Sequence, residues 1–364
     1  MGKYFFILKN KKKFLYNKEK TKHMTPEEKF QLIKRNTEEI ITEKELKELL
    51  KKKKKPVVYM GTAITGKPHI AYFLPVLKMA DFLKAGFKVK LLLADVHGAL
   101  DGTPWELLEK RYKYYAKVMP LMFKAIGADI KNFEIIKGSS FQKKQDYQFD
   151  ILKMSKEASI NDCKRAAAEV VKFGDNPKLC GLIYPIMQAL DEEYLKVDIQ
   201  YGGTDQRKIF MFARETLPKI GYKRRIEIMN PMIPGLMGKK MSASDEKSKI
   251  DLADDEKTVK DKIKSAYCEP GVIQDNGILE FTKYVIMTIK TDKKEKLIIK
   301  RPEKFGGNIE FEKYSEIEKA YKSKKLHPLD LKNTVAEEIN KLLEIFRKEK
   351  LEIKKLAKQA YTKS

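Results

Sequence analysis

From residue 57 onward, short apolar runs alternate with longer segments of helical periodicity, and this alternation limits the fold more than any other feature. The strand-like runs are 57–58, 89–94, 133–136, 197–201 and 226–229, and the helical segments are 70–83, 105–126, about 145–171, 179–190 and 204–216. Short apolar runs of this kind are typical of strands buried on both faces of a parallel sheet. The pattern therefore predicts a doubly wound, Rossmann-like α/β domain, whose ligands bind beyond the carboxyl ends of the strands.

The segments on either side of this domain are expected to be helical. Thr25-Pro26-Glu27-Glu28 has the pattern of a helix start, and helical periodicity is expected to continue through Ile40 and Ile41. A second cap at Thr42 precedes another helix. Beyond residue 251 the chain is charged and mostly helical, with a strand expected at 297–299 and a long helix at 328–350. We therefore predict an α/β domain at 24–250 and a mostly helical C-terminal domain at 251–364.

Residues 1–23 form a basic extension, which its composition predicts to be a disordered arm. An organellar transit peptide is the alternative, although this stretch has neither serine nor arginine. The chain has three widely spaced cysteines and no run of 18 apolar residues, which indicates a reducing compartment and no membrane span. We expect a cytoplasmic protein, with organellar targeting by residues 1–23 left open.

The segment 59–72 has the pattern of a strand, a glycine-punctuated turn at Gly61 and Gly66, and a helix. Glycines let the backbone approach a ligand, and a helix start with Lys67 and His69 beside it suits a phosphate. The spacing matches neither the Walker pattern nor Gly-x-Gly-x-x-Gly. The alternative is an ordinary strand–turn–helix that happens to carry a lysine.

Basic residues outnumber acidic ones, with 76 Lys and Arg against 51 Asp and Glu, giving a formal net charge of +25. Such an imbalance favours a polyanionic partner such as nucleic acid. The alternative is lysine spread over every solvated face. The four histidines do not cluster, and the cysteines form no metal-ligand pattern, so we predict no bound metal.

Several segments, in order along the chain from about residue 25 onward, resemble class I aminoacyl-tRNA synthetases. The two general signatures are Pro68-His69-Ile70-Ala71, similar to HIGH, and Lys240-Met241-Ser242-Ala243-Ser244, similar to KMSKS. Four further segments, at 184–194, 202–208, 304–307 and 327–333, resemble the archaeal/eukaryotic type of tyrosyl-tRNA synthetase. Two residues depart from the family pattern, because Ala71 replaces the glycine of HIGH and Ala243 replaces the usual lysine or serine. The second change removes one phosphate contact and puts more weight on Lys240.

The resemblance implies a tyrosine–tRNA ligase that joins tyrosine to ATP, releases pyrophosphate and passes the tyrosyl group to the terminal adenosine of tRNA-Tyr. His69 and Lys240 would be the catalytic residues, holding the triphosphate, with Mg²⁺ carried by ATP and no tightly bound cofactor. Gly61 and Gly203 would let ATP approach the backbone, and Asp205 would bind the ribose hydroxyls. The implied ATP-binding residues are Gly61, His69, Gly203, Asp205, Lys240, Met241 and Ser242.

The resemblance also implies a tyrosine site, in which Tyr59 and Asp191 bind the phenolic hydroxyl. Tyr184, Gln188 and Gln206 would hold the ammonium and carboxylate end. The spacing of Tyr184, Gln188 and Asp191 places all three on one helix face, although an ordinary amphipathic helix would show the same spacing. His97 follows a strand end, and its two interpretations, lining the pocket or supporting the fold, stay open.

For tRNA, the resemblance implies that Arg207 and Lys208 read the first base pair of the acceptor stem. Phe305 would stack on the first anticodon base and Asp330 would hydrogen-bond to it, which makes 251–364 an anticodon-binding domain. The alternatives are a solvated helix face for Arg207 and Lys208, a core position for Phe305 and a helix cap for Asp330. By family, the connective insertion at about 145–180 would form a homodimer interface.

Two rival functions stay open at this stage. Tryptophanyl-tRNA synthetase shares the fold and both signatures, but Asp191 with Tyr59 suits a hydroxyl better than an indole. A synthetase-like protein that binds RNA without catalysis would have no use for His69, Lys240 and Asp205.

Overall fold

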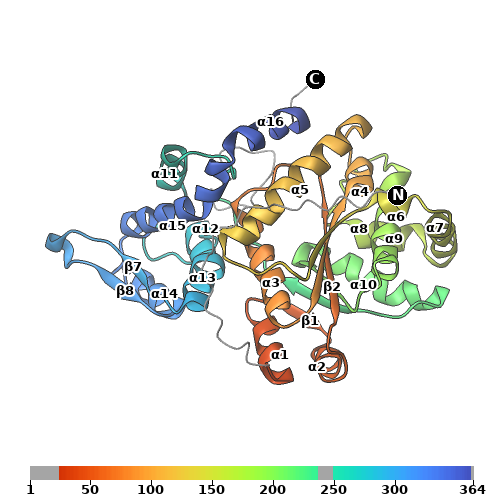
Figure 1. Ribbon diagram of the computed structural model, residues 1–364, viewed down its shortest axis with the longest axis horizontal. Coiled ribbons are helices and arrows are strands. Elements are labelled where there is room, and N and C mark those ends of the chain that lie inside the picture. Colours follow the sequence, from red (N-terminus) through yellow and green to blue (C-terminus); the bar gives the residue numbers. More distant parts are fainter. Residues whose placement is uncertain (1–23, 237–248, 362–364) are drawn as a thin grey trace.

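The centre of the molecule is a six-stranded sheet in the order β1-β6-β5-β2-β3-β4 (Figure 1). The structure is a computed structural model that describes residues 24–236 and 249–361. Its strands are β1 (Glu39–Ile41), β2 (Val57–Ala63), β3 (Lys88–Ala94), β4 (Phe133–Lys137), β5 (Ile199–Gly203) and β6 (Ile226–Asn230). Strands β2 to β6 are parallel, and β1 pairs antiparallel with β6. Strand order reverses between β2 and β5, so their carboxyl ends flank the point where such sheets bind ligands. The predicted α/β class is confirmed.

Helices cover both faces of this sheet (Figure 1). One face carries α3 (Phe73–Lys84) and α5 (Leu108–Ala125), and the other carries α7 (Gln145–Glu157), α8 (Ile160–Ala167), α9 (Leu179–Tyr194) and α10 (Arg207–Thr216). Short helices α4 (Asp95–Leu100) and α6 (Ser139–Gln142) follow β3 and β4. The apolar core on the α3/α5 side continues into the C-terminal helices, whereas α7 to α10 enclose a second core.

The expectation that Ile40 and Ile41 continue the first helix is wrong. Helix α1 (Pro26–Lys34) starts at the predicted cap, Thr25, but ends before Asn36, whose φ of 53° is left-handed. Residues Glu39–Ile41 then form β1 at the sheet edge. The β-branched pair serves a strand equally well, because two apolar residues in succession do not define a period. Helix α2 (Glu43–Lys52) begins at the predicted capping box of Thr42.

Three further boundaries differ from the predictions. The helical stretch expected over 145–171 is two helices, because the chain is extended at Ala158 and Ser159 caps α8. The glycines read as turns, Gly61 and the pair 202–203, lie inside β2 and β5, since parallel strands pair through their glycines as through any other residue. Each turn begins after these glycines, where the strand ends.

The C-terminal part contains a two-stranded sheet and six helices within its described residues. They are α11 (Glu256–Ser265), α12 (Gly277–Phe281), α13 (Met287–Lys293), β7 (Leu297–Ile299), β8 (Ile309–Phe311), α14 (Tyr314–Lys322), α15 (Pro328–Lys348) and α16 (Lys350–Tyr361). The predicted strand at 297–299 is present, but the long helix ends at Lys348 rather than 350. Helix α16 returns to α5 and the turn after β2, where Tyr361 Oη donates to the carbonyl of Gly66 at 2.9 Å. The boundary near residue 250 stays a prediction.

Across the described ranges, no helix is both long and apolar enough to span a membrane. The same residues contain no group of three or more His, Cys, Asp or Glu side chains arranged to hold a metal ion.

Candidate active site

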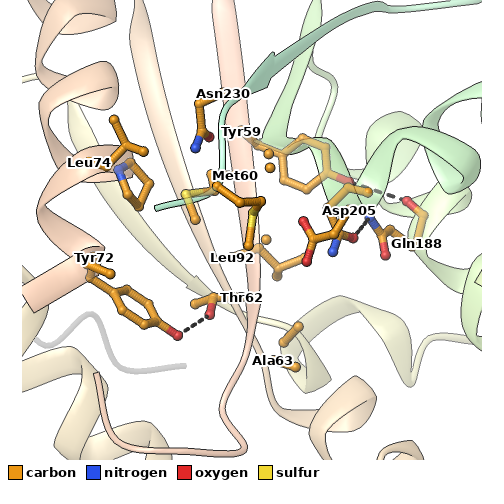
Figure 2. A pocket seen from close by; sticks show the side chains of 18 of the residues that line it. Tyr59, Met60, Thr62, Ala63, Tyr72, Leu74, Leu92, Gln188, Asp205 and Asn230 are labelled. Atoms are coloured by element: carbon orange, nitrogen blue, oxygen red, sulfur yellow. Dashed lines mark hydrogen bonds between the residues drawn. The ribbon is translucent and has the colours of Figure 1, made fainter. Parts of the chain in front are cut away.

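A cavity of about 300 Å³ opens at the carboxyl ends of β2 and β5, where the strand order reverses (Figure 2). The residues predicted from sequence that line it are Tyr59, Gly61, His69, Tyr184, Gln188, Asp191, Gly203, Asp205 and Gln206. They come from β2, the turn after it, α9, β5 and the 3-10 turn (Thr204–Gln206) that precedes α10. The structure thus brings the predicted tyrosine and ATP residues to one place, while their individual roles stay predictions.

Asp191 lies at the closed end of this cavity and is 1% exposed. Its Oδ1 accepts hydrogen bonds from Tyr147 Oη and Gln142 Nε2, both at 2.8 Å. Burial raises the pKa of Asp191 to about 7, against the opposing effect of these two donors. The two donors fix the carboxyl group in place, because rotating it would break both bonds. The cavity therefore presents an oriented acceptor in its wall.

Tyr59 faces the same end from β2 and is 1% exposed. Its Oη accepts a hydrogen bond from Gln200 Nε2 at 2.6 Å and donates to the backbone carbonyl of Gln188 at 3.3 Å (Figure 2). The second bond is long and therefore weak. A bound hydroxyl can replace it at little cost, so Tyr59 can serve as a donor to a ligand.

The middle of the cavity holds two glutamines and an aromatic pair. Gln188 Nε2 donates to Gln206 Oε1 at 3.1 Å, which ties α9 to the start of α10 (Figure 2). The rings of Tyr184 and His97 pack edge to face, with centroids 4.7 Å apart. His97 lines the cavity and is neutral at pH 7, because burial lowers its pKa to about 4. Its side chain therefore contributes shape and a neutral ring, not a positive charge.

The two predicted glycines of the ATP site have different surroundings. A Cβ at Gly203 would come within 2.6 Å of Asp205 Oδ1 and 2.8 Å of Met232 Sδ, so both side chains would have to move to admit any larger residue. A Cβ at Gly61 would meet nothing closer than 3.7 Å, which is ordinary contact. Any need for glycine at 61 must therefore come from a bound ligand.

His69 connects the first signature to the chain that follows the second. It is 7% exposed, and its Nδ1 has no hydrogen-bond partner among the described residues. His69 forms an isolated antiparallel bridge with Asp251, and Ile70 N donates to Ile250 O at 3.1 Å. Lys240, Met241 and Ser242 lie outside the described residues, but the chain re-enters the described part beside His69. The first signature is therefore next to the chain that follows the second one.

Sequence reasoning missed three side chains that complete the deep end of the site. Gln142 and Tyr147 hold Asp191, and Gln200 holds Tyr59. Two of them carried a usable signal. Gln142 follows the carboxyl end of β4 closely, and Gln200 is a polar residue inside an otherwise buried strand.

The pair predicted to read the acceptor stem lies at the start of α10, and both side chains are already ion-paired. Arg207 makes a two-bond contact with Glu39 at 2.6 and 2.9 Å, and Lys208 Nζ lies 2.7 Å from Glu169. Both basic residues are exposed. Phosphate or base contacts by either would have to replace these surface pairs, which are weak enough to exchange.

The predicted anticodon residues lie at two neighbouring turns of the C-terminal part. Phe305 is 61% exposed, with Lys304 Nζ 5.1 Å from its ring centroid, so the alternative that it is a core residue is wrong. Helix α15 is capped by His327, whose Nδ1 accepts from Leu329 N at 3.1 Å, so Asp330 is not the cap. Arg301 joins the two turns, bonding to the carbonyls of residues 307 and 325 at 3.0 and 3.4 Å.

A doubly wound sheet, a cavity at its switch point and the two signatures in the sequence define the catalytic-domain class of the class I aminoacyl-tRNA synthetases. Comparison with known proteins agrees, since residues 50–344 match the family model of tRNA synthetases class I (W and Y). The chain is 49% identical to the cytoplasmic tyrosine–tRNA ligase of Saccharomyces cerevisiae, covering 89% of this chain and 84% of the yeast protein. The chain belongs to the tyrosyl-tRNA synthetase family of the archaeal and eukaryotic type.

Two other comparisons set the extent of this likeness. The cytoplasmic tyrosine–tRNA ligase of Danio rerio is 49% identical over 93% of this chain, and the chain spans 64% of that relative's length. The crystal structure of Archaeoglobus fulgidus tyrosyl-tRNA synthetase complexed with L-tyrosine has a TM-score of 0.82 and 39% identity, covering 89% of this chain and 99% of that one.

Proposed function

We propose that this chain is a tyrosine–tRNA ligase. The observation that carries the proposal is the closed end of the cavity, where the buried carboxyl of Asp191 and the hydroxyl of Tyr59 face the same space. A phenolic hydroxyl needs one acceptor and one donor, and this end supplies both. Neither a phenylalanine ring nor an indole would satisfy both groups, so each would leave a buried polar group unpaired.

The reaction proceeds in two transfers. A carboxylate oxygen of tyrosine attacks the α-phosphorus of ATP, and pyrophosphate leaves. A ribose hydroxyl of the terminal adenosine of tRNA-Tyr then attacks the carbonyl carbon of the adenylate, and AMP leaves. Both steps depend on positioning and charge stabilisation, so no side chain has to act as nucleophile. ATP enters with Mg²⁺ as substrate, and His69 and Lys240 hold its triphosphate.

The test is ATP–pyrophosphate exchange with tyrosine, phenylalanine and tryptophan, each offered alone. Exchange with tyrosine only is the expected result. Exchange with tryptophan would reassign the chain to the sibling enzyme. Failure with all three would mean that the chain has the fold without the activation step, and would leave RNA binding without catalysis as its function.

The same proposal includes a homodimer and a cytoplasmic location. Four large apolar side chains are exposed on the insertion helices: Phe149, Leu152, Ile160 and Leu179, between 58% and 69% exposed. Exposed apolar side chains of this size suit an interface with a second copy of the chain. The yeast and Danio rerio relatives are both named cytoplasmic, which supports that location here.

Anticodon recognition gives a prediction for the C-terminal part. Phe305→Ala is expected to raise the KM for tRNA-Tyr in aminoacylation by about tenfold or more, because stacking on one base contributes about 1–3 kcal/mol. Pyrophosphate exchange, which needs no tRNA, should be unchanged. Asp330→Ala is expected to charge a tRNA altered at the first anticodon base relatively better than the wild-type enzyme does.

Ile298→Ala is the matched control, because Ile298 is another exposed apolar side chain of the same part, on β7. It should leave the KM for tRNA unchanged. An equal rise in both variants, or no rise in either, would show that Phe305 does not contact the anticodon.

A further inference from the structure

Two glutamates lie wholly buried beside the amino-acid cavity. Glu192 on α9 and Glu227 on β6 are both 0% exposed. All four of their carboxylate oxygens lack a hydrogen-bond partner within the described residues. Burying even one unpaired carboxylate is costly, so two ionised groups at such a place would be strongly destabilising. The pair must therefore carry at least one proton.

The sheet places this pair in line with Tyr59. Gln200 on β5 is the register partner of Tyr59 on β2 and of Glu227 on β6, so the three side chains stand on one face of the sheet. Neighbouring strands are about 4.8 Å apart, which keeps adjacent members of such a row within reach of each other. Helix α9 covers this face, since Tyr59 Oη donates to its Gln188 carbonyl. Glu192 approaches from the same helix.

The amide of Gln200 connects the two ends of the row. Its Nε2 donates to Tyr59 Oη at 2.6 Å, while its Oε1 is buried without a partner among the described residues. A carboxyl proton on Glu227, the register neighbour of Gln200, supplies the donor that Oε1 lacks. With Oε1 held on that side, the amide must turn Nε2 toward Tyr59.

The nearest cations do not supply this donor. Arg225 donates through Nε to the carbonyl of Val197 at 3.0 Å and pairs with Glu193 at 2.5 Å. Arg214 donates to two backbone carbonyls and pairs with Glu45 on α2 at 3.1 Å. Both guanidinium groups therefore use their hydrogen bonds elsewhere.

The electrostatics of the pair agree with a retained proton. Burial raises the pKa of Glu192 and Glu227, and the negative charge of Glu192 raises that of Glu227 further. The charges of Arg214 and Arg225 oppose this rise, whereas Asp191 adds to it at Glu192. At neutral pH the balance therefore keeps a proton on the pair.

We propose that the buried pair Glu192 and Glu227 retains a carboxyl proton and, through Gln200, acts as a pair of positioning residues that fix the direction of the Tyr59 hydroxyl. This inference rests on the proposed function. Because Gln200 donates to Tyr59 Oη, the hydrogen of Tyr59 stays available and can turn from the weak bond with the Gln188 carbonyl to a bound hydroxyl. Tyrosine then accepts from Tyr59 and donates to Asp191. A reversed Gln200 amide would take the hydrogen of Tyr59, and the substrate hydroxyl would face two acceptors with only one hydrogen.

The kinetic test uses a double variant, Glu192→Met with Glu227→Met, and the single variant Glu227→Gln. Replacing a buried charged pair by apolar residues of similar size is usually tolerated by the fold. The double variant removes every donor for Gln200 Oε1, so we expect the KM for tyrosine in pyrophosphate exchange to rise about tenfold, the size of one hydrogen bond. The weak exchange with phenylalanine should not change. In Glu227→Gln, an amide N–H replaces the carboxyl proton. The KM for tyrosine and the exchange with phenylalanine should therefore both stay near their wild-type values.

A purely structural role would raise the KM of both amino acids together, and that result would overturn the proposal. So would a double variant that keeps the wild-type preference for tyrosine. The thermal midpoint of each variant, measured alongside, shows whether it is folded.

Infrared difference spectroscopy tests the retained proton without any substrate. The wild type at neutral pH should show the carbonyl stretch of a protonated carboxyl group that the double variant Glu192→Met with Glu227→Met lacks, whereas Asp191 is present in both proteins and cancels in the difference. If the double variant keeps the full band, the pair holds no proton and the proposal fails. A wild type without tyrosine exchange overturns the proposed function and the specificity role together, while the infrared result still decides the retained proton.

Discussion

Asp191→Ala is expected to abolish most of the preference for tyrosine over phenylalanine, reducing the ratio of the two kcat/KM values by at least about 10³-fold. The preference of tyrosyl-tRNA synthetases is about 10⁵, a measured value of this family and not a consequence of the present geometry. That preference depends on buried polar groups that phenylalanine would leave unpaired. Asp191 is such a group, 1% exposed and fixed by Tyr147 and Gln142. Exchange kinetics with each amino acid measure the ratio.

The matched control is Asp191→Asn, which keeps the size of the side chain and an acceptor for Tyr147 and Gln142. It should fold like the wild type and show an intermediate loss, because its amide can still hydrogen-bond to a phenol oxygen. The loss should come from tyrosine, whose kcat/KM falls, with little change for phenylalanine. Unchanged kinetics for both amino acids in Asp191→Ala would contradict the role of this carboxyl group.

The alternating pattern from residue 57 was sufficient to predict the fold class, because parallel strands are buried on both faces and their apolar runs stand out. It was not sufficient at the sheet edge. Strand β1 has only three residues, all partly exposed, and its pairing partner β6 is almost 190 residues away in sequence. No local pattern records such a contact. The break at Ser159 did have a local signal, since Ser159 and Asp162 form a capping box, but the flanking helical periodicity concealed it.

The site was predictable where a residue belongs to a motif and not where it supports one. Tyr59, Gln188 and Asp191 follow from the family signatures, and the cavity brings them together. Gln142 binds Asp191 from the helix after β4, and Gln200 binds Tyr59 from β5. Their function appears only when the strands are in register. Sequence spacing cannot supply that register, because the two glutamines lie 49 and 141 residues from the groups they bind.

His69→Ala is expected to lower kcat for tyrosine-dependent exchange by about 10²–10³-fold, the usual effect of removing one preorganised donor at a developing charge. The KM for tyrosine should change little, because the proposed role of His69 is to bind the triphosphate and not the amino acid. Its ring packs on Tyr72 with centroids 5.5 Å apart, so Tyr72→Phe, which keeps that ring contact, is the matched control and should retain most activity.

The protonation state of His69 makes this prediction sharper. Burial, followed by the charge of Lys249, lowers the pKa of His69 to about 4. A base with a lowered pKa becomes charged only below that value, so between about pH 6 and pH 8 the ring is neutral and its contribution constant. Under the proposed function, a neutral His69 would stabilise the departing pyrophosphate by donating an N–H, and Lys240 would supply the positive charge. Any step in activity near pH 7 should then belong to Asp191, whose pKa burial raises to about 7, and should persist in His69→Ala. If the step in activity near pH 7 is absent from His69→Ala, His69 acts as a cation instead.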